Sequence, residues 1–165
     1  MNARGTIVVG VDGSDGSRTA LEFALEEAVR RGAAVQVVSA LPEAGYWATS
    51  YGMSPELLKE LSADVEKTAR DMVDAVVRER GDALADVTVE VLGLGGTPAQ
   101  VLLSQSRDAD LLVVGHRGRG GFRSALLGSV SLQCVMHASV PVTVVRPIRE
   151  STAPDDGRDT AGARA

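Results

Sequence analysis

Two short apolar segments, 6–11 and 110–114, constrain the fold of this chain more than any other feature. Neither alternates apolar with polar side chains, and valine, isoleucine and leucine dominate both. Strands of this kind are buried on both faces, which is typical of parallel sheets covered by helices on each side. We therefore expect a parallel sheet as the middle layer of the fold.

Helical patterns separate the extended segments. Apolar residues recur at three- or four-residue spacing over 17–31 and 55–80, and a glycine follows each pattern. Thr97 and Pro98 supply an N-cap and a first-turn proline for a shorter helix. The complete prediction is five strands at 6–11, 34–39, 87–92, 110–114 and 142–145, with helices at 17–31, 55–80, 97–107 and 129–137.

This alternation predicts an α/β fold, a doubly wound three-layer sandwich of Rossmann-like type with right-handed crossovers. The chain has 165 residues, so we expect a single domain, over 1–149, and the composition of 150–165 is typical of a disordered tail. A long loop, 41–54, holds Tyr46, Trp47 and Tyr51. These side chains would cover a ligand or pack on the next helix, and the sequence favours neither alternative.

Composition excludes several functions. The net charge of −5 opposes attraction to nucleic acid and to anionic membranes, and an aromatic content of 3% leaves few side chains for base stacking. No segment approaches the roughly 20 apolar residues of a membrane span, so we expect a cytoplasmic protein with no membrane or nucleic-acid partner. Cys134 is alone and lies in an apolar segment, which predicts a buried thiol. His116 and His137 are too few for a histidine-rich metal site.

Two turns carry unusual residues, one at 10–14 and one at 115–121, each directly after a buried strand. Ligands of doubly wound sheets bind beyond the carboxyl ends of strands, where the winding direction reverses. Glycine-rich turns expose backbone N–H groups to an anion, and Gly128-Ser129 would start the next helix, whose N-terminus also attracts anions. The alternative is a flexible glycine loop capped by serine.

Other site types fit less well. A Walker loop needs Gly-Lys-Ser/Thr, and the dinucleotide fingerprint needs a third glycine where Arg123 stands. A hydrolase triad of Ser129, His116 and Asp12 lacks the Gly-x-Ser-x-Gly elbow. By itself, Asp12 is better explained as a cap of the following turn or helix.

The spacing Gly115-x2-Gly118-x9-Gly128-Ser129 resembles the signature of the universal stress protein family, in its ATP-binding branch. The segments 7–14 and 96–98 are similar to that family's first strand and turn and to its turn before the third helix, and the resemblance spans about residues 5–147. It implies a five-stranded parallel sheet in order 3-2-1-4-5, the adenine nucleotide alpha hydrolase-like arrangement. The ends of the first and fourth strands would then share one cleft.

The resemblance also implies roles for residues. Asp12 would contact the adenine and ribose half of a nucleotide, while the glycines and Ser129 would hold ribose and phosphates. Ser39-Ala40 departs from the family, in which histidine often precedes valine or alanine. The implied nucleotide-binding set is Gly10, Asp12, Gly13, Ser14, Ala40, Gly115, His116, Arg117, Gly118, Arg119, Gly128, Ser129, Val130 and Ser131.

The function implied by the resemblance is a stress-response sensor or regulator that binds ATP, ADP or AMP, with Mg²⁺ carried on the phosphates. We expect binding with at most slow ATP hydrolysis, because Asp12 is the only carboxylate in either turn. One alternative is a nucleotide-independent module that binds a regulatory protein partner. Another is a flavin or dinucleotide carrier on the same architecture.

The last apolar run is expected at one edge of the sheet. An exposed apolar edge tends to pair with another strand, and the resemblance implies a C2 homodimer formed in this way. The pairing segment would be Val142, Thr143, Val144 and Val145.

Overall fold

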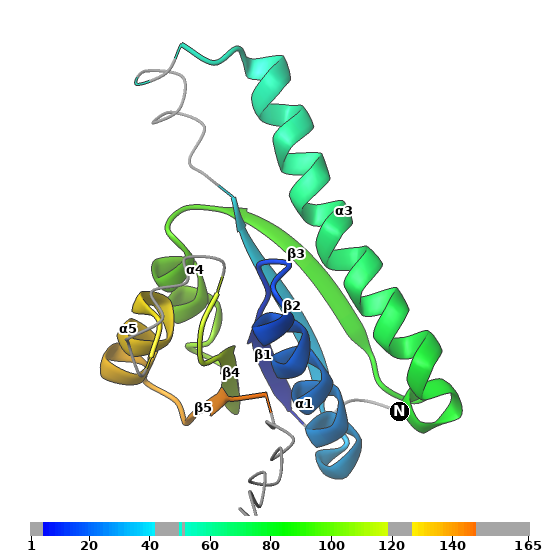
Figure 1. The fold of residues 1–165 in the computed structure, drawn as a ribbon. Helices are drawn as coiled ribbons and strands as arrows, with labels where there is room; N and C mark the ends of the chain where they lie inside the picture. The colour runs from blue at the N-terminus through cyan, green and yellow to red at the C-terminus, as the bar shows by residue number, and fades with distance from the viewer. Residues whose placement is uncertain (1–4, 42–49, 51, 119–126, 148–165) are drawn as a thin grey trace, which may run out of the picture.

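The computed structural model describes residues 5–41, 50, 52–118 and 127–147. Five strands form one parallel sheet in the order β3-β2-β1-β4-β5 (Figure 1). The fold class and strand order predicted from the sequence are confirmed. The strands are β1 (Thr6–Gly10), β2 (Ala34–Leu41), β3 (Val89–Gly95), β4 (Leu111–Gly115) and β5 (Val142–Val145), and the helices are α1 (Asp15–Arg31), α3 (Pro55–Arg80), the 3-10 turn η1 (Gly81–Leu84), α4 (Pro98–Gln105) and α5 (Ser129–His137).

Some sequence-based predictions fall outside the described residues. They are the ligand role of Arg119, the alternatives for Tyr46, Trp47 and Tyr51, and the tail 150–165.

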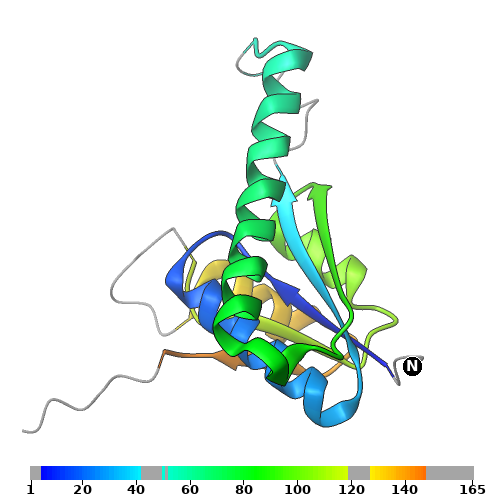
Figure 2. The same cartoon turned by 90° about the vertical axis from the view of Figure 1, so that its right-hand side faces the viewer.

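Helices cover both faces of the sheet, with α1 and α3 on one side and α4 and α5 on the other (Figures 1 and 2). Alternate residues of β1 therefore enter different cores. Ile7 and Val9 pack among side chains of α1 and α3, whereas Val8 packs against those of α4 and α5, and all three are fully buried. Burial on both faces is the reason that the β1 sequence is continuously apolar.

Several boundaries differ from the prediction by one to three residues, and two of them have a clear physical cause. Helix α1 begins at Asp15, two residues earlier than expected, because the Ser14 hydroxyl caps it by accepting a hydrogen bond from the Ser17 N–H at 3.2 Å. Strand β3 begins at Val89 rather than at Val87, because η1 and the following turn take up that segment, with the Val87 N–H bonded to the Leu84 carbonyl at 3.0 Å.

Helix α3 extends well past the carboxyl edge of the sheet (Figure 2). Its second half contributes Ala69, Val73 and Val76 to the core, whereas Leu57 and Leu61 in its first half are each 41% exposed. The amphipathic pattern predicted this helix correctly but not that its first half would lie outside the main core. Within the described residues, no helix is long and apolar enough to cross a bilayer.

Candidate functional site

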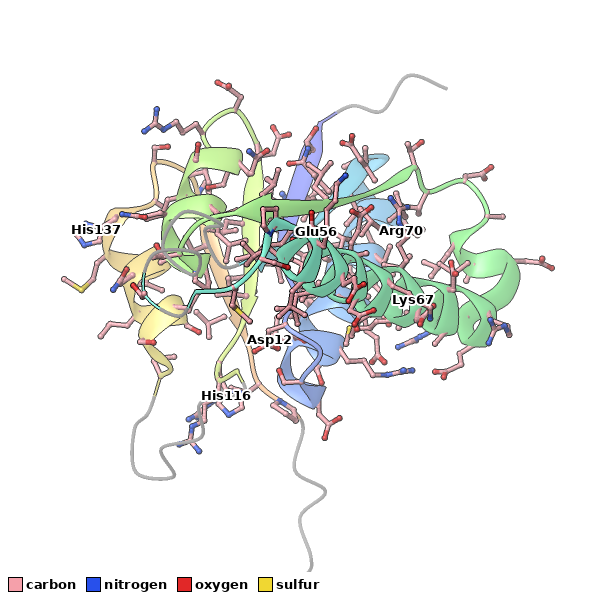
Figure 3. The ribbon with its side chains drawn as sticks, turned by 90° about the horizontal axis from the view of Figure 1, so that it is seen from above. Asp12, Glu56, Lys67, Arg70, His116 and His137 are labelled. Atoms are coloured by element: carbon pink, nitrogen blue, oxygen red, sulfur yellow. The ribbon has the colours of Figure 1, made fainter. Side chains whose placement is uncertain are left out.

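The two turns singled out in the sequence lie next to each other in space. β1 pairs with β4 in the middle of the sheet, with Val9 opposite Val113, and the chain leaves β1 toward one side of the sheet and β4 toward the other. This is the position where the winding direction reverses and where ligands bind in doubly wound folds. Viewed onto this edge, Asp12 lies near its centre, and His137 lies apart on the outer side of α5 (Figure 3).

Asp12 organises the turn that follows β1. Its Oδ1 accepts hydrogen bonds from the Ser14 backbone N–H at 3.0 Å and from the Ser14 hydroxyl at 2.5 Å. The same hydroxyl caps α1. The role of Asp12 as a cap of this turn therefore accounts for one of its two carboxylate oxygens. The Ser14 hydroxyl is engaged within the turn as well.

The first turn of α1 lies directly against the end of β4, backbone to backbone. A Cβ on Gly115 would lie 2.6 Å from the Gly16 carbonyl oxygen, and a Cβ on Gly16 would lie 2.5 Å from the Arg117 carbonyl oxygen. Real Cβ atoms do not come this close to backbone, so both positions require glycine at this geometry. Sequence reasoning found Gly115 through its motif but missed Gly16, which the repeated Asp-Gly-Ser of 12–17 could have indicated.

Gly118 closes the site on the other side of Asp12. A Cβ on Gly118 would collide with Asp12 Oδ2, so the absence of a side chain lets the loop after β4 approach the carboxylate. One oxygen of Asp12 thus serves its own turn, and the other faces the glycine loop. Gly115 and Gly118 are therefore needed here because a side chain at either position would collide with the neighbouring backbone or with the Asp12 carboxylate.

The start of α5 is fastened to the end of β4 by two hydrogen bonds. The Gly128 N–H donates to the His116 carbonyl at 2.8 Å, and the buried Ser131 hydroxyl donates to the Gly115 carbonyl at 2.6 Å. A third bond, from the His116 N–H to the Val145 carbonyl at 2.8 Å, ties the end of β4 to β5. The first intrahelical bond of α5 runs from the Leu132 N–H to the Gly128 carbonyl. The N–H groups of 129–131 consequently belong to the unpaired first turn of the helix, where an anion is favoured.

A cleft of about 760 Å³ lies between these elements, at the carboxyl edge of the sheet. Its volume is within the range of small-molecule sites. One part is walled by the glycine loop, Arg117 and the start of α5, and another by apolar side chains including Val38, Leu102 and Val114. A polar part whose helix start suits an anion and an apolar part thus share one cavity.

Most of the residues predicted for the site line this cleft. Gly13 instead lines an adjoining smaller cavity, while Ser14 and the His116 side chain are not part of the lining, and Arg119 lies outside the described residues. The predicted residues that line the main cleft are Gly10, Asp12, Ala40, Gly115, Arg117, Gly118, Gly128, Ser129, Val130 and Ser131.

Several lining residues were not predicted. Pro98 and Leu102 come from α4, and Val65 comes from α3, far from either turn in the sequence. Leu102 faces the end of β1 so closely that a Cβ on Gly10 would lie 2.8 Å from its Cδ1. The Thr97-Pro98 helix start was the one signal in the sequence that could have pointed to α4.

Two further observations concern titratable groups. Cys134 is fully buried as predicted, and burial raises the pKa of its thiol. Among the described residues, no group of three or more His, Cys, Asp or Glu side chains is arranged to hold a metal ion.

The sheet order, the position of the cleft and the glycine cradle define the class, a doubly wound α/β protein with a cleft at its switch point. The chain belongs to the universal stress protein family, whose model matches residues 3–146. It is 36% identical over 182 residues to universal stress protein Rv1996 of Mycobacterium tuberculosis, an alignment that covers 96% of this chain and 56% of that protein. The chain spans about half the length of the curated relatives it matches.

Solved structures agree with the fold. A universal stress protein in complex with cAMP is 26% identical, with a TM-score of 0.59 over 88% of this chain and 98% of that one. A universal stress protein family protein from Arabidopsis thaliana with AMP bound is 23% identical, with a TM-score of 0.55 over 92% of this chain and 97% of that one.

The contact between α1 and β4 generates a first prediction. Gly16→Ala places a methyl group against the Arg117 carbonyl and is expected to lower the free energy of unfolding by about 1–3 kcal/mol, as overpacking does. Urea denaturation measures the change. The control is Gly95→Ala, where a Cβ would meet nothing within 4 Å and the expected change is below about 0.5 kcal/mol. Equal effects of the two substitutions would contradict the proposed role of the contact.

Proposed function

We propose that this protein binds an adenine nucleotide in the switch-point cleft and acts as a nucleotide-dependent sensor or regulator in a stress response. The observation that carries the proposal is the cradle made by Gly118 and the first turn of α5 beside the Asp12 carboxylate. Membership in the universal stress protein family and the cAMP complex of a 26% identical member support the choice of ligand class.

In this proposal each part of the cleft has its own role. The N–H groups at 129–131 and the Ser129 hydroxyl receive the phosphates, helped by Arg117 and the positive end of the α5 dipole. Asp12 accepts a ribose hydroxyl, the usual partner of an acidic residue in nucleotide sites on such folds. The apolar wall around Ala40 and Leu102 takes the base. ATP, ADP and AMP share these features, and Mg²⁺ would be carried on the phosphates.

Ligand binding, with at most slow hydrolysis of ATP, is the proposed activity. Efficient phosphoryl transfer requires a positioned base or water-orienting group together with charge stabilisation. Among the residues that the structure describes, Asp12 is the only carboxylate lining the main cleft, and one of its oxygens already holds the α1 turn. The proposal therefore assigns Asp12 to binding. A regulatory protein partner would respond to the occupied state.

One added negative charge can test whether the start of α5 binds phosphate without destabilising the fold. Ser129→Asp puts a carboxylate at an exposed first-turn position, which stabilises a helix N-terminus but repels a phosphate. We expect AMP and ATP to bind at least tenfold more weakly in calorimetric titration, with adenosine binding unchanged. Gln133→Glu adds the same charge beyond the first turn of the same helix and serves as the control.

The result that would contradict the proposal is specific. Unchanged AMP affinity in Ser129→Asp, or no binding of AMP or ATP up to millimolar concentration by the wild-type protein, removes the support for a nucleotide site. The protein would then be a nucleotide-independent partner-binding module.

We also propose that two copies pair through β5 into a C2 dimer. The carbonyls of Pro141 and Val145 accept hydrogen bonds from Leu112 of β4 and from His116 directly after it. By the alternation along a strand, Val142 and Val144 therefore direct their backbone groups to the open edge. On the neighbouring helix α5, Leu132, Val135 and Met136 are 46%, 49% and 65% exposed. An apolar edge beside exposed apolar side chains favours self-association.

Val144→Pro tests the dimer without disturbing the ladder between β4 and β5. Proline removes an outward-facing N–H and is tolerated at a sheet edge. We expect light scattering to show a dimer for the wild type and a monomer for the variant at micromolar concentration, with unchanged far-UV circular dichroism. A wild-type monomer would overturn the proposal.

A further inference from the structure

A second cavity of about 190 Å³ adjoins the main cleft. Val11, Asp12, Ser39 and Val65 line both, so the two spaces meet over the ends of β1 and β2. The main cleft reaches toward α4 and α5, whereas the second cavity lies on the other face of the sheet, against α3. We call this second cavity the α3 chamber.

The residue between the two spaces is a buried polar one. Val38 packs in the core on the α4 side, so the alternation of the strand turns Ser39 toward the α3 side. Ser39 is 3% exposed, and its hydroxyl makes no hydrogen bond within the described part of the chain. Buried polar groups are normally hydrogen-bonded, so a hydroxyl facing a cavity is suited to pairing with a ligand.

The rest of the chamber is mostly apolar with an acidic rim. Leu61, Val65 and Ala69 of α3 form its wall, and Asp64 joins Asp12 as a second carboxylate. Thr68 also lines it, with its hydroxyl donating to the Asp64 carbonyl at 2.8 Å and still able to accept a bond. Apolar cavities of about 150 Å³ hold a benzene ring, so this one has room for a single ring. Two carboxylates would repel a phosphate there.

We propose that the α3 chamber is a subsite for an uncharged, ring-sized apolar group attached to the 2′ or 3′ oxygen of the bound nucleotide. The inference rests on the proposed nucleotide site, in which Asp12 receives a ribose hydroxyl. Acylation of one of the two oxygens leaves the other ribose hydroxyl to donate to Asp12. Because Asp12 lines both spaces, the substituent on the neighbouring oxygen enters the chamber. The preferred ligands are therefore ribose-acylated adenine nucleotides, and nucleotides with a 2′ or 3′ phosphate are disfavoured.

The probe is 2′(3′)-O-(N-methylanthraniloyl)-AMP, whose ring fluoresces more strongly, and at shorter wavelength, in an apolar site. Its dissociation constant is compared with those of AMP and adenosine 2′,5′-bisphosphate in the wild type. We expect the acylated nucleotide to bind at least threefold more tightly than AMP with a blue-shifted emission, and the bisphosphate to bind more weakly than AMP.

Thr68→Phe fills the chamber from a position outside the main cleft, and Ala63→Phe adds the same ring at an exposed position of α3 that lines neither space. We expect Thr68→Phe to abolish the preference and the blue shift while AMP affinity stays unchanged, and Ala63→Phe to behave as the wild type. If AMP binds but the acyl group brings no preference, or the preference survives Thr68→Phe, the chamber is not a subsite. If AMP itself fails to bind, the proposed nucleotide site fails and the chamber proposal with it.

Discussion

The close backbone approach between the first turn of α1 and the end of β4 is the constraint on which the rest of the site depends. Gly115 and Gly16 stand where any side chain would strike backbone oxygen, and Gly118 stands where a side chain would strike Asp12. These contacts bring the β1 turn and the β4 loop together across the switch point. With the Ser131 hydroxyl bonded to the Gly115 carbonyl, they also set where α5 begins. The cleft follows from this packing, since its polar walls are the three elements so joined.

The same packing supports the proposal that the cleft at the carboxyl edge of the sheet accepts a charged ligand. Burying an anion is costly unless donors are already in place to receive it. Here the donors are backbone groups of a helix start whose position is fixed by hydrogen bonds to the sheet, so little ordering remains for ligand binding. One Asp12 oxygen, by contrast, bonds its own turn while the other faces the glycine loop, so Asp12 couples its side of the cleft to the α1 cap.

The sequence predicted the fold well because its strongest signals are local. Continuous apolar strands, helix caps and terminal glycines fix five strands and the main helices, and only ends such as the starts of α1 and β3 moved. What the sequence did not reveal depends on distant segments meeting. Val65, Pro98 and Leu102 line the cleft from two helices on opposite faces of the sheet, and Leu61 is exposed because α3 outruns the strands. The family resemblance supplied the strand order. The repeated Asp-Gly-Ser of 12–17 could have indicated Gly16, but not that Gly16 contacts the Arg117 carbonyl.

The most direct test of the central claim is an NMR titration of isotope-labelled protein with AMP, with the backbone amides assigned. A nucleotide seated in the switch-point cleft predicts saturable shifts that are largest at the amides of 129–131, with further shifts at Gly118 and at Asp12–Ser14. Saturable binding whose shifts lie elsewhere would show that the site has been misplaced. No shifts at millimolar AMP would contradict the account altogether.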